Sequence, residues 1–227
     1  MPEMPSFDNT MPAGHICGKP EKNCIETRGQ AMTNFEKCQE FVLKWEGGLS
    51  DDPEDRGGLT KYGVSMAYLQ DLARSRPSVL RDILGTATIT RQTVKSLTQA
   101  QAGALFKFSF WDPFQLDDQP LSVCLCAYDM NVNHGSGNAM RIIQRACNLM
   151  TSVFPKLSVD GKFGPKTRAA MRLLNCPNGI AAVANKRQSF YDSIVANRPS
   201  QKVFIKGWTR RCSAMKRQAL EWLDADE

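Results

Sequence analysis

Apolar residues recur with a helical period along most of the chain, beginning near residue 33. Thr33-x-x-Glu36 has the spacing of a capping box, which predicts a helix start at Thr33. Gly47-Gly48 predicts that this helix ends near Glu46. Its apolar stripe consists of Phe35, Cys38, Val42 and Trp45.

Helical spacing, capping residues and prolines predict further helices towards the C-terminus. Thr98 is expected to cap one that stops at Trp111-Asp112-Pro113, and Pro120 opens the next, which runs to about Asn133. Ser136 and Pro165 are expected to begin two more. The remaining predicted helices cover residues 65–74, 178–197 and 203–223.

The exceptions to this pattern are the N-terminus and residues 49–64. Residues 1–31 show neither a helical nor a strand period, which indicates a poorly ordered extension. Residues 49–64 combine Asp, Pro and Gly, which suits an irregular loop or a small β-hairpin. We therefore expect a mainly α fold with one region over 32–138 and a second helical region over 139–227, packed on the first.

Composition excludes several classes of protein. The 227 residues carry a net charge of +6, with 42% hydrophobic and 23% charged residues, which is typical of a globular chain and excludes collagen, coiled coil and wholesale disorder. No apolar stretch approaches the roughly 18 to 20 residues of a membrane span. The absence of an export signal leads us to expect synthesis in the cytoplasm.

The eight cysteines favour structural free thiols over a disulfide scaffold. A chain of this length does not need disulfides to fold, and the spacings C-x6-C and C-x-C match no zinc template. Disulfides and a metal site remain the less favoured alternatives. We expect neither a metal nor an organic cofactor.

The acidic loop after the first helix carries the first suggestive chemistry. Glu46 lies at a helix C-terminus next to Trp45, and the helix dipole and the apolar neighbour both favour a protonated carboxyl. Asp55 and Thr60 follow within the loop. A protonated acid, an ionised carboxylate and a hydroxyl to hold water are the groups that glycosidic hydrolysis needs. Taken alone, such a loop is also typical of a solvated turn.

Four separated blocks in one order resemble glycoside hydrolase family 108, a group of lysozyme-like N-acetylmuramidases. The run WEGGLSDDPEDRGGLTKYGV at 45–64 is similar to the family's E-G-G, D-P-x-D, G-G-x-T motif. Phe110-Trp111-Asp112-Pro113 and the DMNVNHG segment at 129–135 resemble two further family blocks. The run DGKFGPKT at 160–167 and the segment 204–211 resemble the peptidoglycan-binding half that accompanies this catalytic half.

The resemblance implies a lysozyme-like fold and assigns candidate catalytic roles. Glu46 becomes the acid that protonates the leaving oxygen, Asp55 stabilises the cationic transition state or acts as base, and Thr60 positions water. This spacing is close to that of the phage-type lysozymes. Asp51 and Asp52 compete with Asp55 for the second carboxylate role.

Candidate binding residues follow from the same blocks. A sugar cleft is expected to use Tyr62, Trp111, Asn131, Asn133 and His134, with core packing an equal alternative for Trp111 and a helix-end role an alternative for His134. Contact with the wall is expected through Asp160, Phe163 and Lys166, although this turn also suits a plain helix N-terminus.

We therefore predict a monomeric endolysin-type lysozyme that cleaves peptidoglycan between N-acetylmuramic acid and N-acetylglucosamine and acts in the periplasm after release. The alternatives are a lytic transglycosylase and a non-catalytic peptidoglycan-binding protein. The basic residues of 202–217 suit a solvated face, with contact to anionic or outer-membrane lipid as the weaker alternative. No motif supports nucleic-acid binding.

Overall fold

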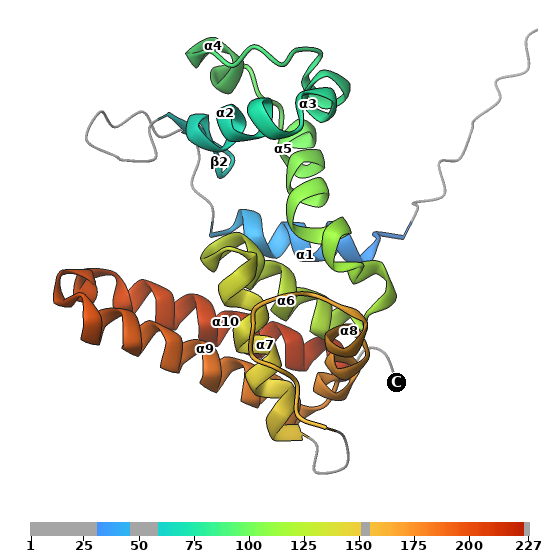
Figure 1. The fold of residues 1–227 in the computed structure, drawn as a ribbon, viewed down its shortest axis with the longest axis vertical. Helices are drawn as coiled ribbons and strands as arrows, with labels where there is room; N and C mark the ends of the chain where they lie inside the picture. The colour runs from blue at the N-terminus through green and yellow to red at the C-terminus, as the bar shows by residue number, and fades with distance from the viewer. Residues whose placement is uncertain (1–30, 46–58, 151–154, 225–227) are drawn as a thin grey trace, which may run out of the picture. The chain divides into compact units, whose positions relative to one another are not determined.

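The computed structural model describes residues 31–45, 59–150 and 155–224 of the chain, and those residues are mostly helical (Figure 1). The chain divides into two units, Met1–Ala31 and Met32–Glu227, and every element below belongs to the second. The prediction of a mainly α fold is confirmed. The α-helices are α1 (Asn34–Leu43), α2 (Met66–Ser75), α3 (Pro77–Leu84), α4 (Arg91–Lys95), α5 (Gln99–Phe106), α6 (Leu121–His134), α7 (Ser136–Met150), α8 (Pro165–Met171), α9 (Pro177–Asn197) and α10 (Ile205–Asp224).

Helix α1 begins as the sequence predicts and ends three residues early. The capping box is present, because the Glu36 backbone N–H donates to Thr33 Oγ1 at 3.2 Å while Glu36 Oε2 accepts from the Thr33 backbone at 2.8 Å. After Leu43 the chain tightens: the N–H groups of Lys44 and Trp45 donate to carbonyls three residues back. This narrower turn closes the helix before Glu46 is reached.

A two-stranded sheet precedes α2. Strands β1 (Thr60–Lys61) and β2 (Val64–Ser65) are antiparallel, with Thr60 opposite Ser65 and Lys61 opposite Val64. The connecting residues Tyr62 and Gly63 both have positive φ, 51° and 77°. Two such residues make the turn type that matches the twist of a tight hairpin. Of the two predictions for this segment, the small hairpin is the one observed in its described part.

Two short helices were not predicted. Helices α3 and α4 have eight and five residues, too few for the apolar period to stand out. Their capping signals are nevertheless in the sequence: Pro77 occupies the first turn of α3, Gly85 ends it at φ 75°, and Thr90 caps α4. Such local signals identify short helices that periodicity misses.

Helix α5 does not simply stop at Trp111. It continues into a π-helical turn, Lys107–Trp111, and then into two 3-10 turns, Asp112–Phe114 and Leu116–Asp118. Pro113 lies in the first 3-10 turn, where its missing N–H costs no helical hydrogen bond. The predicted stop is therefore a change of helix type, a feature that often marks functional sites.

Helix α6 is the centre of the core. Every residue from Leu121 to Asn131 is buried, because α1, α7, α9 and α10 all pack against this helix. A helix that is buried on all sides carries a weak amphipathic signal, and its polar residues must find partners inside the protein. None of the helices in the described part of the chain combines the length and apolar character of a membrane span.

Helices α9 and α10 lie side by side as a hairpin joined by the 3-10 segment Pro199–Phe204 (Figure 1). Met215 and Ala219 of α10 are fully buried. Phe204 differs from them: it lies in the connecting segment and is 52% exposed. The buried apolar face of this region therefore lies within α10 and does not include Phe204.

Candidate active site

The predicted catalytic residues fall partly outside the described residues. Glu46 and Asp55, and with them Asp51 and Asp52, lie in the segment 46–58, which the structure does not describe. Thr60 is described: it is half-buried in β1, opposite Ser65. Its place at the first residue of the hairpin is compatible with the predicted role, and the three catalytic assignments stay predictions.

The helix that leads to Glu46 is anchored by aromatic packing. The rings of Phe35 on α1, Trp111 and Tyr128 on α6 meet edge to face with centroids 5.3, 5.7 and 5.5 Å apart. Tyr128 also donates a hydrogen bond to Gln39 on α1. Together these contacts fix α1 on the buried helix α6, and with it the position from which the chain enters the acidic loop.

Trp111 therefore serves the core and not a sugar cleft. Its side chain is fully buried, and the indole Nε1–H donates to Asp117 at 2.9 Å. A ring with no exposed face cannot stack on a pyranose, so the structure corrects the substrate-binding prediction in favour of the core alternative. Trp111 is the last residue of the π-helical turn, and its ring packs there against Phe35 of α1 and Tyr128 of α6.

Asn131 is likewise buried, and it supports the π-helical turn. Its Nδ2 donates to the carbonyl oxygen of Phe110 at 3.0 Å, and its Oδ1 has no partner among the described residues. A π turn displaces carbonyl groups from the regular helical pattern, and a buried carbonyl needs a new donor. The prediction that Asn131 contacts sugar is wrong, because the side chain is enclosed by protein.

Tyr62 occupies a strained turn position beside the predicted catalytic hydroxyl. Its φ of 51° lies in the left-handed region, which costs an L residue roughly 1–2 kcal/mol. The Lys61 ammonium lies 5.3 Å from the centre of its half-buried ring. A large aromatic residue kept in a conformation that favours Gly or Asn indicates that the ring itself has a use, for which sugar stacking stays the prediction.

The Tyr62→Asn variant tests sugar stacking by the Tyr62 ring separately from its effect on the stability of the fold. Asn tolerates left-handed backbone, so the variant should melt at the same temperature as the wild type or higher. Loss of a stacking ring should raise the KM for peptidoglycan several-fold with little change in kcat. Tyr62→Phe keeps the ring and should behave as the wild type. Unchanged KM in Tyr62→Asn would remove Tyr62 from the binding site.

A buried ion cluster joins α6 to α9 and α10. Asp129 is fully buried and accepts from Arg187 Nη1 of α9 at 2.5 Å and from Arg211 Nε of α10 at 2.8 Å. The two guanidinium groups hold the pKa of the Asp129 carboxyl below its usual value against the opposing effect of burial. One carboxylate thus joins three helices. The prediction that all basic residues of α10 are solvated is wrong for Arg211, which is 6% exposed.

Asn133 and His134 belong to the edge of this cluster. Arg187 Nε donates to His134 Nε2 at 3.1 Å and to Tyr191 Oη at 2.8 Å, and Tyr191 in turn donates to Asn133 Oδ1 at 3.1 Å. The His134 ring also packs against Phe190 and Tyr191. His134 is the last residue of α6, and sugar contact by Asn133 and His134 stays a prediction. Gly135 follows at φ 73° and ψ 147°, a conformation reserved for glycine.

The cluster makes stability sensitive to acid. Burial and the neighbouring Arg187 lower the pKa of His134 from 6.5 to about 3, so the folded protein holds a neutral imidazole. The unfolded chain binds a proton below pH 6.5 that the folded chain excludes until about pH 3, so stability is lost as pH falls through this window. Between pH 7 and pH 5 the loss should be ~2 kcal/mol.

The His134→Gln variant tests this dependence. A neutral amide can accept from Arg187 but does not titrate, so the free energy of unfolding should change less between pH 7 and pH 5 than in the wild type. Urea denaturation at both pH values gives the two differences. Equal pH dependence in the two proteins would contradict the assignment to His134.

The predicted wall-binding turn is fixed by internal hydrogen bonds. Gln144 of α7 donates to Asp160 Oδ1 at 2.9 Å and accepts from the Gly161 backbone N–H at 2.9 Å, while Asp160 also accepts from the Lys162 N–H at 2.8 Å. A Cβ at Gly161, where φ is 77°, would lie 2.6 Å from the Gly137 carbonyl oxygen. Asp160 therefore organises the turn against α7.

The other two wall-binding candidates differ in exposure. Phe163 is half-buried and meets Phe114 edge to face at 5.5 Å, so it attaches this turn to the 3-10 turn Asp112–Phe114. Lys166 is exposed near the start of α8. Of the three predicted wall contacts, Asp160 and Lys166 are exposed, and contact of any of the three with the wall stays a prediction.

The cysteines of the described residues do not form a second reactive site. Cys38, Cys124, Cys126, Cys147 and Cys212 are buried, and Cys176 is half-buried. Burial raises the pKa of Cys147 to about 12 and that of Cys38 well above its usual value. Buried thiols with raised pKa are poor nucleophiles. Over the described ranges, no group of three His, Cys, Asp or Glu residues is placed to hold a metal ion.

Two known families match successive parts of the chain. The sequence model of Glycosyl hydrolase 108 matches residues 39–135, and that of a Predicted Peptidoglycan domain matches residues 138–213. Residues 39–135 are thus similar to the glycosyl hydrolase 108 family. The glycosyl hydrolase 108 region runs from within α1 to Gly135, and the peptidoglycan region follows from α7 into α10. The ion cluster joins the two regions through Asp129, Arg187 and Arg211.

A solved structure shows the same fold. SagA of Brucella abortus is 26% identical to this chain with a TM-score of 0.63, and the match covers 83% of this chain and 95% of SagA. No curated protein matches the chain. The protein is a lysozyme-like glycoside hydrolase that acts on peptidoglycan.

Proposed function

We propose that the protein is an N-acetylmuramidase that hydrolyses the β-1,4 bond between N-acetylmuramic acid and N-acetylglucosamine. The observation that carries this proposal is the glycosyl hydrolase 108 match over 39–135. It contains Glu46, Asp55 and Thr60 in the order and spacing of the catalytic motif. The adjoining match to a Predicted Peptidoglycan domain indicates that the polymer is peptidoglycan.

The proposed reaction needs one acid, one carboxylate and one water. Glu46 donates its proton to the oxygen that leaves with N-acetylglucosamine as the bond to C1 of N-acetylmuramic acid breaks. Asp55 faces the cationic sugar or takes the proton of the attacking water, and Thr60 orients that water. If water attacks directly, the two carboxyl groups should stand ~6.5–9.5 Å apart and the anomeric configuration inverts.

The elements on both sides of the acidic loop are well packed, which supports the proposed roles of its residues. The buried contacts of Phe35 and Gln39 fix α1, which ends at Leu43 just before the acid. The β1–β2 hairpin holds Thr60 in a paired strand at the other end of the acidic loop. A loop anchored at both ends by packed elements can present its carboxylates in a defined geometry.

The second candidate function is a lytic transglycosylase. Such an enzyme uses a single acid and closes a 1,6-anhydro ring on the muramic acid instead of adding water. Asp55 and Thr60 favour hydrolysis, because a transglycosylase has no need for a group that holds or activates water.

The experiment that tests the proposal identifies the new sugar ends. Purified peptidoglycan is incubated with the protein, the products are reduced with borohydride, and the alditols are identified after acid hydrolysis. The proposal predicts muramitol. Glucosaminitol would place the cut at the other glycosidic bond, and intact peptidoglycan would support a protein that binds without cleaving.

The setting that we propose is that of an endolysin, stored in the cytoplasm and acting as a monomer on periplasmic peptidoglycan after release. A weak contact with anionic lipid is proposed for the α9–α10 tip, where Val203 is 78% and Phe204 52% exposed between Lys202 and Lys206. Sedimentation with anionic vesicles tests this contact: Val203→Ser/Phe204→Ser should reduce binding, and no binding by the wild type would exclude it.

A further inference from the structure

A groove of about 560 Å³ lies between α1 and α10. Its walls come from both family regions, because α1 belongs to the glycosyl hydrolase 108 region and Arg210 to the peptidoglycan region. The lining residues are Phe41, Lys44, Trp45, Arg210, Ala214, Arg217, Gln218 and Glu221.

The groove combines an aromatic wall with cations. Phe41 and Trp45 pack with ring centroids 6.4 Å apart, and the Arg210 guanidinium lies 6.0 Å from the centre of the Trp45 ring. An arginine stacked on an indole is held in place while its N–H groups stay available to a carboxylate. The guanidinium fork can bind both oxygens of one carboxylate at once.

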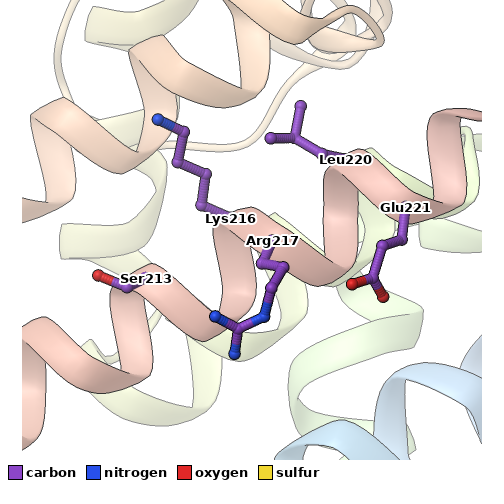
Figure 2. A pocket seen from close by; sticks show the side chains of 5 residues that line it. All are labelled: Ser213, Lys216, Arg217, Leu220 and Glu221. Carbon is purple, nitrogen blue, oxygen red and sulfur yellow. The ribbon is translucent and has the colours of Figure 1, made fainter.

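The charge of the groove is positive. Lys44, Arg210 and Arg217 are exposed cations, opposed by Glu221 alone among the lining residues. Figure 2 shows that Arg217 and Glu221 project from the same side of α10, away from Lys216 and Leu220. A second, smaller hollow of about 340 Å³ shares Arg217 and Glu221 but is lined by α10 alone, so it lacks the aromatic wall.

The position of the groove relates it to the reaction. Trp45 directly precedes Glu46 in the chain, and consecutive Cα atoms are about 3.8 Å apart. The groove therefore includes the residue that adjoins the proposed acid in the chain. In peptidoglycan, the lactyl group of each N-acetylmuramic acid carries a peptide stem with free carboxylates, and this stem hangs beside the proposed scissile bond.

We propose that the α1–α10 groove binds carboxylates of the peptide stem attached to the muramic acid. The inference rests on the proposed function, because it places the muramic acid at Glu46. Arg210 and Arg217 bind the carboxylates, and Trp45 packs against the apolar part of the stem. The peptidoglycan region thereby takes part in substrate recognition at the active site itself.

Kinetics on two substrates test the groove. The first substrate is glycan that carries its peptide stems, and the second is the same glycan after an amidase has removed them. The variant R210Q/R217Q should raise KM roughly tenfold on the first substrate and leave KM on the second unchanged, with kcat preserved on both. Equal losses on both substrates would overturn the proposal.

The matched control is R81Q/R145Q. Arg81 on α3 and Arg145 on α7 are exposed and lie outside the groove, and their replacement changes the net charge by the same two units. The control should match the wild type on both substrates. A rise in KM on the stem-bearing glycan equal to that of R210Q/R217Q would show a general charge effect and overturn the proposal.

A binding measurement keeps the inference separate from catalysis. Calorimetry on the Glu46→Gln protein compares a soluble disaccharide-peptide with the same molecule whose carboxylates are amidated. The acid form should bind about tenfold more tightly, and R210Q/R217Q should abolish the difference. Equal binding of the two forms would refute carboxylate binding by the groove, even if the wild type cleaves peptidoglycan. Failure of the wild type to cleave would refute only the proposed reaction.

Discussion

Replacing Glu46 by Gln is expected to lower the rate of peptidoglycan hydrolysis by about 10²–10⁴-fold. Gln has nearly the same shape but no proton to donate to the leaving oxygen. The buried contacts of Phe35, Gln39 and Trp111 that position α1 do not involve residue 46, so the variant should fold and sediment with purified cell walls. The release of soluble fragments over time gives the rate.

Glu40→Gln is the matched control for this variant. Glu40 lies exposed on α1, six residues before the proposed acid, and the substitution makes the same change of functional group. It should retain the wild-type rate. A Glu46→Gln protein that is as active as Glu40→Gln would show that another residue supplies the proton.

Replacing Asp129 by Asn is expected to destabilise the protein by ~3–5 kcal/mol. The substitution leaves Arg187 buried without its countercharge, and Arg187 has no exposed surface. Arg211 loses the same partner. Because these groups join α6 to α9 and α10, the variant should expose the junction of the two family regions. Urea denaturation followed by circular dichroism measures the loss.

Asp82→Asn provides the comparison for Asp129. Asp82 is exposed on α3, and its replacement should change stability by less than about 0.5 kcal/mol. A second variant, Arg187→Met, removes the other member of the buried pair. It should also destabilise the fold, by leaving Asp129 with Arg211 alone. Asp129→Asn with wild-type stability would contradict the structural importance of the cluster.

Much of the fold can be predicted from the sequence because its signals are local. The capping boxes at Thr33 and Thr98, the proline that opens α8 and the apolar stripe of α1 each act within a few residues. The 3.6-residue period then locates the longer helices. Helices α3 and α4 were missed because five to eight residues give too little period to recognise.

The candidate site was less predictable because its contacts join distant segments. Arg187 and Asp129 are 58 residues apart, and neither carries a local signal that it will be buried. The sequence pattern of α10 predicted a solvated position for Arg211, but its side chain is buried because it donates to the buried Asp129 carboxylate. Trp111 and Asn131 looked like cleft residues because their types suit sugar binding, but Trp111 is buried at the end of a π-helical turn and Asn131 is buried on α6.

Mass spectrometry can identify the soluble fragments that the wild type and Glu46→Gln release from purified peptidoglycan. We expect fragments that end in reducing N-acetylmuramic acid from the wild type and almost none from the variant. Fragments that end in 1,6-anhydro-muramic acid would contradict hydrolysis and establish a transglycosylase. Equal release of reducing fragments by both proteins would contradict the role of Glu46.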